Sequence, residues 1–292
     1  MNPPHEFLLC LPLAYDTNVK NNIWMQDYND TEIIVNREKA MRELHKLYRS
    51  LTREGIVNLL PHSEACKLQD LVFIANNGIV IRDKGDSVFV APKFFAPNRV
   101  GEELLAIEYF KQRGVKVIQC PYFFEGEADL KKISSTHYVG GYGLRSCREA
   151  YEWFEEQFGL NIIKVEMKDE RLYHLDCAIL PLKEGLTLVA TDAFSAQELR
   201  AIEAQTEIVP VTYDEACAGI TGSLVVGDKI FADYSYDRTN SRECPVAIKN
   251  GKLKQQKLDL ICRKYGMDVE YFDLTEYYKG GASLSCLVLR VA

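Results

Sequence analysis

The sequence predicts a single closed α/β domain in which five similar strand-and-helix units surround a common axis. Two observations support this fold class. Five stretches with the apolar periodicity of a helix each run directly into a short apolar strand, and the pattern recurs about every 50 to 60 residues. A unit of that size cannot bury its apolar face alone, so we expect the five units to pack against one another around the axis.

The five helix-to-strand stretches follow one another along nearly the whole chain. They are 37–61, 102–121, 146–167, 195–211 and 257–274. Ser195 and Glu198 predict a capping box at the start of the fourth helix. We expect a left-handed glycine to cap each of the other four helices: Gly55, Gly114, Gly159 and Gly266.

A polar turn and a β-rich segment follow each helix-to-strand stretch. Segments 71–81, 177–190 and 222–235 show this pattern. The opening apolar strand, 7–15, is expected to pair with the closing one, 284–291. That pairing would complete the fifth unit from the two ends of the chain, so the domain is predicted to cover residues 1–292.

The composition limits the classes of function. The chain carries a net charge of −7 and an isoelectric point near 5.4, which argues against electrostatic binding of nucleic acid. We see no signal peptide and no run of about 18 apolar residues, so neither secretion nor a membrane span is expected. These features predict a cytoplasmic protein that can take a small cationic substrate; they leave a homo-oligomer open.

Nine cysteines are scattered along the chain without any C-x-x-C pair. This pattern predicts reduced thiols rather than a disulfide framework. The five histidines and the cysteines lack the spacing of a zinc site, and nothing in the sequence indicates a cofactor.

Polar residues recur at equivalent positions in the five units, after each helix-to-strand stretch. They are Asp70 and Asn76 after the first stretch, Glu125, Glu127 and Asp129 after the second, His174 and Asp176 after the third, Asp214, Glu215 and Cys217 after the fourth, and Cys286 after the fifth. In a pseudo-symmetric ring, equivalent positions of the units converge on the axis. We therefore expect one thiol, one imidazole and several carboxyl or amide groups to share a pocket.

Six motifs occur in an order that resembles a known superfamily. They are DLVFIANNG, NRVGEE, FEGEAD, GYGLRS, HLD and GGASLSC. The chain resembles the guanidino-group-modifying enzymes, which include arginine deiminases, dimethylarginine dimethylaminohydrolases, amidinotransferases and arginine dihydrolases. The resemblance implies the pentein fold, a five-fold pseudosymmetric α/β propeller.

The resemblance also implies roles for individual residues. Cys286 resembles the nucleophile and His174 the general acid/base. Asp176 and the acidic group of FEGEAD resemble the carboxylates that bind the guanidinium, while Arg99 and Arg145 resemble the arginines that hold the substrate's α-carboxylate. FEGEAD is one residue longer than the commoner motif, so Glu125 and Glu127 compete for the guanidinium role. Small residues before Cys286 are expected to leave room for a flat ligand.

Asn76 stands where an aspartate is usual in the superfamily. An amide can donate as well as accept a hydrogen bond, so Asn76 suits a neutral ureido compound such as citrulline. Arginine dihydrolases resemble this sequence in that asparagine and in an early one matching Asn22. We therefore expect arginine dihydrolysis. A deiminase, a methylarginine hydrolase, an amidinotransferase and a non-catalytic ribosome-associated factor on the same fold are the alternatives.

Overall fold

The described strands form five small sheets of the same design. A computed structural model describes residues 5–234 and 245–291. Each sheet has three strands, of which the first two pair antiparallel and the last two parallel. The sheets are β3–β4–β5 (Ile79–Asp83, Asp86–Ala91, Lys116–Gln119), β6–β7–β8 (Leu130–Lys132, His137–Tyr142, Asn161–Glu166), β9–β10–β11 (Ile179–Lys183, Leu186–Ala190, Glu207–Val211), β12–β13–β14 (Leu224–Val226, Lys229–Tyr234, Asp268–Asp273) and β15–β1–β2 (Leu289–Arg290, His5–Leu9, Gly55–Leu59).

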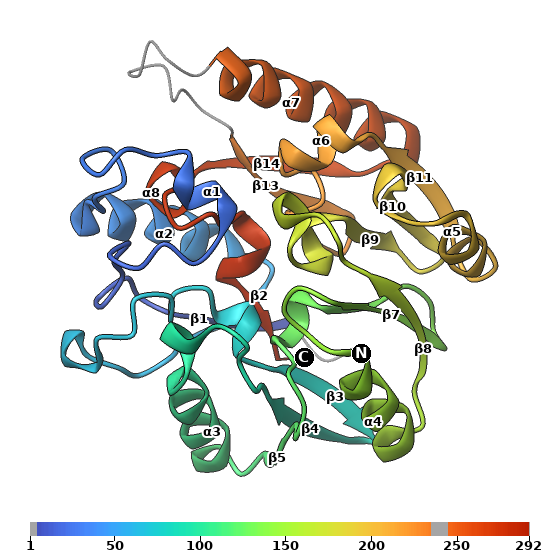
Figure 1. Ribbon diagram of the computed structural model, residues 1–292, viewed down its shortest axis with the longest axis horizontal. Helices are drawn as coiled ribbons and strands as arrows, with labels where there is room; N and C mark the ends of the chain where they lie inside the picture. Colours follow the sequence, from blue (N-terminus) through green and yellow to red (C-terminus); the bar gives the residue numbers. More distant parts are fainter. Residues whose placement is uncertain (1–4, 235–244, 292) are drawn as a thin grey trace.

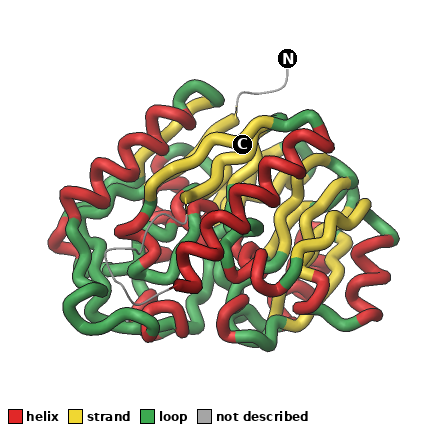
Figure 2. Tube along the Cα trace, turned by 90° about the horizontal axis from the view of Figure 1, so that it is seen from above, coloured by secondary structure: helices red, strands yellow, loops and turns green. Residues whose placement is uncertain are grey.

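One long helix connects the second and third strands of each sheet. The five helices are α3 (Glu102–Gln112), α4 (Arg148–Phe158), α5 (Ala196–Glu203), α7 (Pro245–Tyr265) and α2 (Arg37–Leu51). They lie at the periphery with the sheets inside them (Figure 1), and Figure 2 shows the strands between flanking helices. The predicted five-fold α/β propeller is therefore confirmed. No described helix is long and apolar enough to cross a membrane.

The two ends of the chain close the ring, as predicted. In the sheet β15–β1–β2, Phe7 of β1 lies opposite Arg290 of β15 in an antiparallel pair. On its other side, Phe7 lies opposite Val57 of β2 in a parallel pair. The strand that follows Cys286 is thus held by the first strand of the chain.

The expectation for the helix ends holds at Gly159 and is wrong at Gly55. Gly159 caps α4 with φ of 65°. The helix α2 ends at Leu51, with Thr52 as its cap, and Gly55 begins β2. A Cβ at Gly55 would lie 2.1 Å from the carbonyl oxygen of His5. The glycine is therefore required by the close approach of β1 and not by a helix cap.

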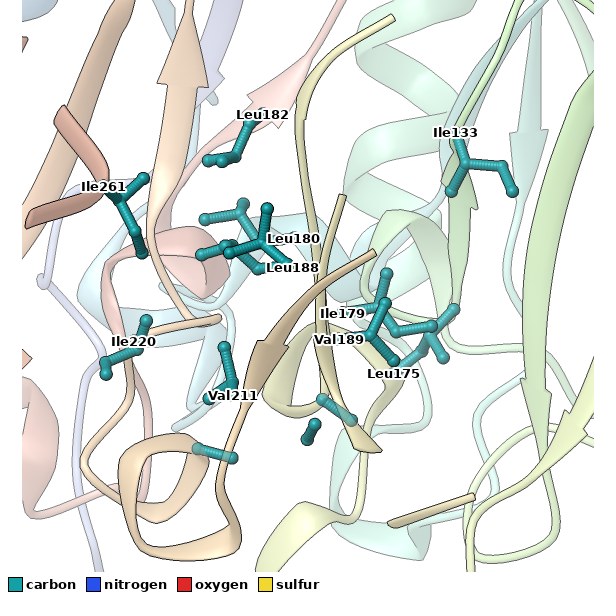
Figure 3. Close-up of a cluster of buried hydrophobic side chains, with 14 of the residues drawn as sticks. Ile133, Leu175, Ile179, Leu180, Leu182, Leu188, Val189, Val211, Ile220 and Ile261 are labelled. Carbon is teal, nitrogen blue, oxygen red and sulfur yellow. The ribbon is translucent and has the colours of Figure 1, made fainter. Parts of the chain in front are cut away.

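Apolar side chains fill the spaces between neighbouring sheets. In the largest cluster, Leu180 and Leu188 of the β9–β10–β11 sheet pack with Ile220 and with Ile261 of α7 (Figure 3). Full burial of one such side chain contributes about 1.5–3 kcal/mol. These contacts fix adjacent sheets relative to each other and hence fix the turns that lead into them.

Each sheet begins with a short turn, which we call its leading turn. Four of these are one-turn 3-10 helices, at Ile74–Asn77, Gly126–Ala128, Leu175–Cys177 and Leu284–Leu287. The β12–β13–β14 sheet instead begins after residues 219–223. The described residues also form three short α-helices, α1 (Ile23–Gln26), α6 (Tyr213–Cys217) and α8 (Thr275–Tyr278), and four further 3-10 helices, at Glu64–Cys66, Pro97–Arg99, Glu170–Leu172 and Thr191–Ala193.

The described cysteines are free thiols, as the sequence predicts. The ninth, Cys244, and the last residue of the predicted segment 222–235 lie outside the described residues.

Candidate active site

One pocket is lined by Asn76 of the first leading turn, by Cys286 of the last, and by His174, which immediately precedes the Leu175–Cys177 turn. Its empty space, which includes open solvent, is about 290 Å³. Of the residues predicted from the sequence, Asn22, Asp70, Asn76, Arg99, Arg145, His174 and Cys286 line it. The structure thus brings together side chains that lie up to 264 positions apart in the chain, from Asn22 to Cys286.

His174 is held in one orientation by Asp129. Its Nδ1 lies 2.9 Å from Asp129 Oδ1, which also accepts from the backbone N–H of Leu175. The other oxygen of Asp129 accepts from Ser146 Oγ at 2.6 Å. Asp129 therefore supports the imidazole and is not among the residues that line the pocket.

The second ring nitrogen of His174 has two partners suited to opposite protonation states. Its Nε2 lies 3.2 Å from Asn76 Nδ2 and 3.4 Å from Glu125 Oε2. Because Nδ1 donates to Asp129, the neutral ring accepts at Nε2 from the Asn76 amide. The protonated ring donates from Nε2 to Glu125. A ring nitrogen with both a donor and an acceptor within reach suits general acid–base catalysis.

Cys286 is buried in the last leading turn. Its Sγ lies 3.8 Å from Asp176 Oδ2. Burial, reinforced by the negative charge of Asp176, raises the pKa of the Cys286 thiol to about 12. The thiol is therefore protonated at neutral pH, and a cation beside the sulfur would favour the thiolate.

Asp176 lies beside Ser285 and Cys286. Its Oδ2 accepts from Ser285 Oγ at 2.8 Å, and its Oδ1 contacts the thiol of Cys177 at 3.7 Å. The carboxylate is 2% exposed and lies outside the pocket lining. It links the leading turn of His174 to that of Cys286.

The structure separates the two glutamates of FEGEAD. Glu125 is fully buried and reaches His174 and, at 3.4 Å, Arg145. Glu127 instead accepts from the backbone N–H of Arg290 at 2.9 Å. It also pairs with the guanidinium of Arg290 at 3.5 Å. Of the two, only Glu125 contacts residues that line the pocket, and Glu127 holds β15.

Both predicted arginines line the pocket, but each already has partners. Arg99 pairs with the fully buried Glu102 at 2.7 Å. Arg145 donates to the carbonyl of Asn21 at 2.8 Å, and its guanidinium lies 4.9 Å from the centre of the Tyr173 ring. Each guanidinium is therefore held in place by its protein contacts.

Asp70 presents a buried oxygen without a hydrogen-bond partner among the described residues. Its Oδ2 accepts from Asn21 at 2.7 Å and from Asn98 at 2.8 Å, whereas its Oδ1 has no partner. Burial raises the pKa of this carboxyl. A hydrogen-bond donor on a bound ligand would satisfy the open oxygen.

Asn22 holds α1 against Gly280 and Gly281, which precede Cys286. Its Oδ1 accepts from the backbone of Met25, and its Nδ2 donates to the carbonyl of Gly280 at 3.0 Å. A Cβ at Gly281 would lie 2.3 Å from Asn22 Oδ1. The expectation that the small residues leave room for a ligand is therefore wrong at Gly281, because the space there is filled by Asn22.

The residues predicted to face the pocket from the fourth unit are the wrong ones, because the turn before its sheet lies further along the chain. Asp214, Glu215 and Cys217 lie in α6, and Glu215 pairs with Lys257 at 3.2 Å rather than facing the pocket. The residues that occupy the leading turn of that sheet are Thr221–Ser223, where Thr221 Oγ1 donates to the carbonyl of Cys177. The additional helix α6 lies between β11 and this turn. The spacing along the sequence therefore predicted the turn at the position of that helix.

Sequence reasoning missed several residues that line the pocket or support it. Tyr173, Phe73, Asn21, Gly280 and Ala282 line it, and Ser146 supports Asp129. Tyr173 adjoins His174, and Phe73 lies in the motif that contains Asn76. Their closeness in sequence to predicted site residues could have identified these two. Among the described residues, no group of three or more His, Cys, Asp or Glu side chains could hold a metal ion.

The fold and this constellation place the chain in the pentein superfamily of guanidino-group-modifying enzymes. The family model described as "N,N dimethylarginine dimethylhydrolase, eukaryotic" matches residues 11–291, and the chain belongs to that family.

Curated relatives support the same placement. The chain is 28% identical to the bifunctional arginine dihydrolase/ornithine cyclodeaminase AgrE of Nostoc sp., over 98% of this chain and 37% of that protein. It is 25% identical to N(G),N(G)-dimethylarginine dimethylaminohydrolase of Mycobacterium tuberculosis, over 100% of this chain and 84% of that one. The chain spans about 37% of the length of the first two curated relatives, AgrE and ArgZ.

A solved structure covers the same region. The N-terminal domain of ArgZ, an arginine dihydrolase from the ornithine–ammonia cycle in cyanobacteria, was crystallised as a mutant bound to substrate. It matches this chain with a TM-score of 0.82 at 27% identity, over 99% of this chain and 98% of that one.

Proposed function

We propose that this chain is an arginine dihydrolase, which converts arginine and two waters to ornithine, carbon dioxide and two ammonia molecules. The observation that carries the proposal is the position of His174. Its ring is fixed by Asp129, faces Glu125 and Asn76, and lines the same pocket as Cys286. A thiol, an oriented imidazole and buried carboxylates are the groups that thiol-dependent hydrolysis of a cation requires.

Substrate binding follows from the buried charges. A guanidinium is planar and cationic, so carboxylates orient it by paired, charge-assisted hydrogen bonds. Glu125 is the better of the two glutamates for this role, with Asp176 beside the sulfur and the open oxygen of Asp70 as further acceptors. We assign Arg99 and Arg145 to the α-carboxylate end of arginine.

The first round begins when the Cys286 thiol, whose ionisation the bound guanidinium favours, releases its proton to solvent and the thiolate attacks the central guanidinium carbon. A bond from sulfur to carbon forms, and the bond from that carbon to a terminal nitrogen breaks as protonated His174 gives its proton to the departing ammonia. The covalent thiouronium adduct remains. His174 then deprotonates a water, which attacks the same carbon and releases citrulline and the thiolate.

The second round acts on a neutral ureido group. Its carbonyl oxygen requires a donor, and Asn76 Nδ2 lies at the reacting end of the pocket, 3.2 Å from His174 Nε2. Asn22 supports this round through its contact with the Gly280 carbonyl. Attack of the Cys286 thiolate on the ureido carbon breaks its bond to the terminal nitrogen, which leaves as the second ammonia, and forms a thiocarbamate. The second water cleaves the bond between carbon and sulfur and restores the thiolate, and the resulting carbamate breaks down to ornithine and carbon dioxide.

Product analysis tests the proposal. The purified chain is incubated with arginine, and citrulline, ornithine and ammonia are quantified over time by mass spectrometry and an ammonia assay. Dihydrolysis predicts two ammonia molecules for each ornithine, whereas citrulline as the sole end product would reject it in favour of deimination.

A methylarginine hydrolase is the second candidate, because the family description and the Mycobacterium tuberculosis relative name that substrate. Release of dimethylamine from dimethylarginine, with no turnover of arginine, would select it. An absolute requirement for an amine acceptor would select an amidinotransferase. The absence of turnover, together with no protection of Cys286 from a chloroacetamidine reagent by arginine, would favour a non-catalytic ribosome-associated factor.

We also infer a cytoplasmic location and one catalytic domain over residues 1–292. The acidic charge and the free thiols of the described residues support the location. The closure of the ring by β1 and β15 supports the domain. The proposed chemistry uses only side chains of this chain and requires no cofactor.

A further inference from the structure

The β12–β13–β14 sheet belongs to the unit that contributes no described residue to the pocket lining, but it contacts the nucleophile segment, residues 283–286, from behind. The carbonyl of Gly222 accepts from the backbone N–H of Ser285 at 2.9 Å. A Cβ at Gly222 would lie 2.4 Å from Ser283 Cβ. The leading turn of this sheet therefore packs directly against the segment that carries Cys286.

A fully buried ion pair lies behind the same segment. Lys254 Nζ of α7 is 2.8 Å from Asp233 Oδ1 of β13, with side-chain exposures of 0% and 1%. Removing both charges from water is costly, so a buried pair is a weak source of net stability. The sequence gives the pair no part in the predicted site, and its position calls for another explanation.

The pair is connected to the nucleophile segment through the backbone. Asp233 Oδ1 also accepts from the N–H of Leu284 at 3.4 Å, and Asp233 Oδ2 accepts from the hydroxyl of Tyr278. Leu284 is fully buried and begins the 3-10 helix that contains Cys286. The Leu284 N–H would be costly to leave without an acceptor in this place.

We propose that Asp233 and Lys254 are positioning residues for Cys286: Asp233 holds the Leu284 N–H, and Lys254 holds the Asp233 carboxylate in place. A charged acceptor makes a stronger hydrogen bond than a neutral one. The pair therefore fixes the backbone two residues before the sulfur. This inference rests on the proposed function in that it takes Cys286 as the nucleophile.

Two charge-free double variants test the acceptor separately from the ion pair. Lys254→Met/Asp233→Asn keeps an oxygen that can accept from Leu284, and Lys254→Met/Asp233→Leu removes it at similar volume. Lys164→Met is the control, because Lys164 pairs with Glu155 at 2.5 Å in another part of the ring. The thermal midpoint, kcat and KM for arginine are measured for each variant, with kinetics well below the lowest midpoint.

Alkylation by iodoacetamide gives a second readout, resolved by peptide mass. Cys286 reports the nucleophile segment, and the fully buried Cys120 reports global opening. We expect the Asp233→Leu double variant to lose about tenfold in kcat with little change in KM. Its Cys286 is expected to react faster while Cys120 does not, because a looser segment buries the sulfur less. The Asp233→Asn double variant, whose neutral oxygen makes a weaker hydrogen bond to Leu284, is expected to lie between wild type and the Asp233→Leu double variant. The control is expected to stay near wild type.

Equal kcat and equal Cys286 reactivity in the two double variants would overturn the proposal, as would a parallel rise in Cys120 reactivity. If wild-type protein does not turn over arginine, the proposed function fails. The difference in alkylation between Cys286 and Cys120 still tests the positioning of the segment in that case.

Discussion

Cys286 combines a buried thiol with a neighbouring carboxylate, and this combination makes its reactivity depend on charge. At a pKa of about 12, the thiolate fraction at pH 7 is on the order of one in 10⁵. A guanidinium held by Glu125 and Asp176 would counter the negative charge near the sulfur. The substrate is thus expected to help ionise its own nucleophile.

This raised pKa predicts a steep pH dependence of alkylation. Below pH 12 the thiolate fraction rises about tenfold per pH unit, so the iodoacetamide rate at Cys286 should still be rising between pH 8 and pH 10. A cationic ligand in the pocket should shift that profile to lower pH. Quantifying the alkylated peptide against pH checks this, and a plateau below pH 8 in the free protein would contradict it.

Asn76 is expected to separate one round of hydrolysis from two. In Asn76→Asp the side chain loses its donor to the ureido oxygen, so citrulline should accumulate and ornithine formation should fall about a hundredfold. Asn161→Asp adds the same charge at an exposed position and serves as the control. Time courses of both products check the prediction, and sustained ornithine formation by Asn76→Asp would count against it.

At this scale, the sequence predicts which leading turns supply polar groups but not how each side chain points. Glu125 and Glu127 flank Gly126, whose φ of 71° sends them to different partners. The spacing of the two glutamates does not reveal that the glycine between them is left-handed, so it does not predict which glutamate faces the pocket. The contact of Asp129 with His174 was missed for a different reason, because it joins residues 45 positions apart in the chain.

Among the elements, α2 and α8 are joined by buried carboxylates. Glu43 of α2 is 3% exposed and accepts from Thr275 Oγ1 and from the N–H of Glu276, at 2.8 and 3.0 Å. Burial raises the pKa of Glu43 to about 7. The contact matters for the site because α8 leads directly into the segment 279–283, before Cys286.

The raised pKa of Glu43 predicts a stability change between about pH 4.5 and pH 7. In that window the folded state binds a proton that the unfolded state has released, so the free energy of unfolding should fall as pH rises. Glu43→Gln should flatten that part of the profile. Urea unfolding at several pH values measures it, with the exposed Glu38→Gln on the same helix as control. An unchanged slope in Glu43→Gln would contradict the assignment.

Most elements were predictable because each buries one face against a neighbour. The apolar periodicity of the helix in 37–61 reports that burial directly, and α2 occupies the expected place. The position of the turn before the β12–β13–β14 sheet was not predictable. The extra helix α6 precedes it, and the acidic residues in the first turn of α6 have the composition expected of a site. The cap expected at Gly55 failed because a contact with β1, 50 positions away, selects glycine there.

For the whole molecule, the pocket exists only while the ring is closed. His174 and Cys286 come from different sheets, and the strand after Cys286 is held by β1 and by Glu127. A ligand that contacts several leading turns therefore binds the folded ring and not the open chain. Such binding should raise the free energy of unfolding by mass action.

The two glutamates of FEGEAD allow a sharp test of this coupling. In a Cys286→Ser background, arginine at about a hundred times its dissociation constant should stabilise the ring by about 2.7 kcal/mol. Adding Glu127→Gln should lower the stability of the free protein, because it weakens the contact with Arg290, yet leave the response to arginine intact. Adding Glu125→Gln should abolish most of that response, because it removes the buried charge beside His174. Thermal unfolding with and without arginine measures both effects, and a response that is lost with Glu127→Gln but retained with Glu125→Gln would reverse their assignments.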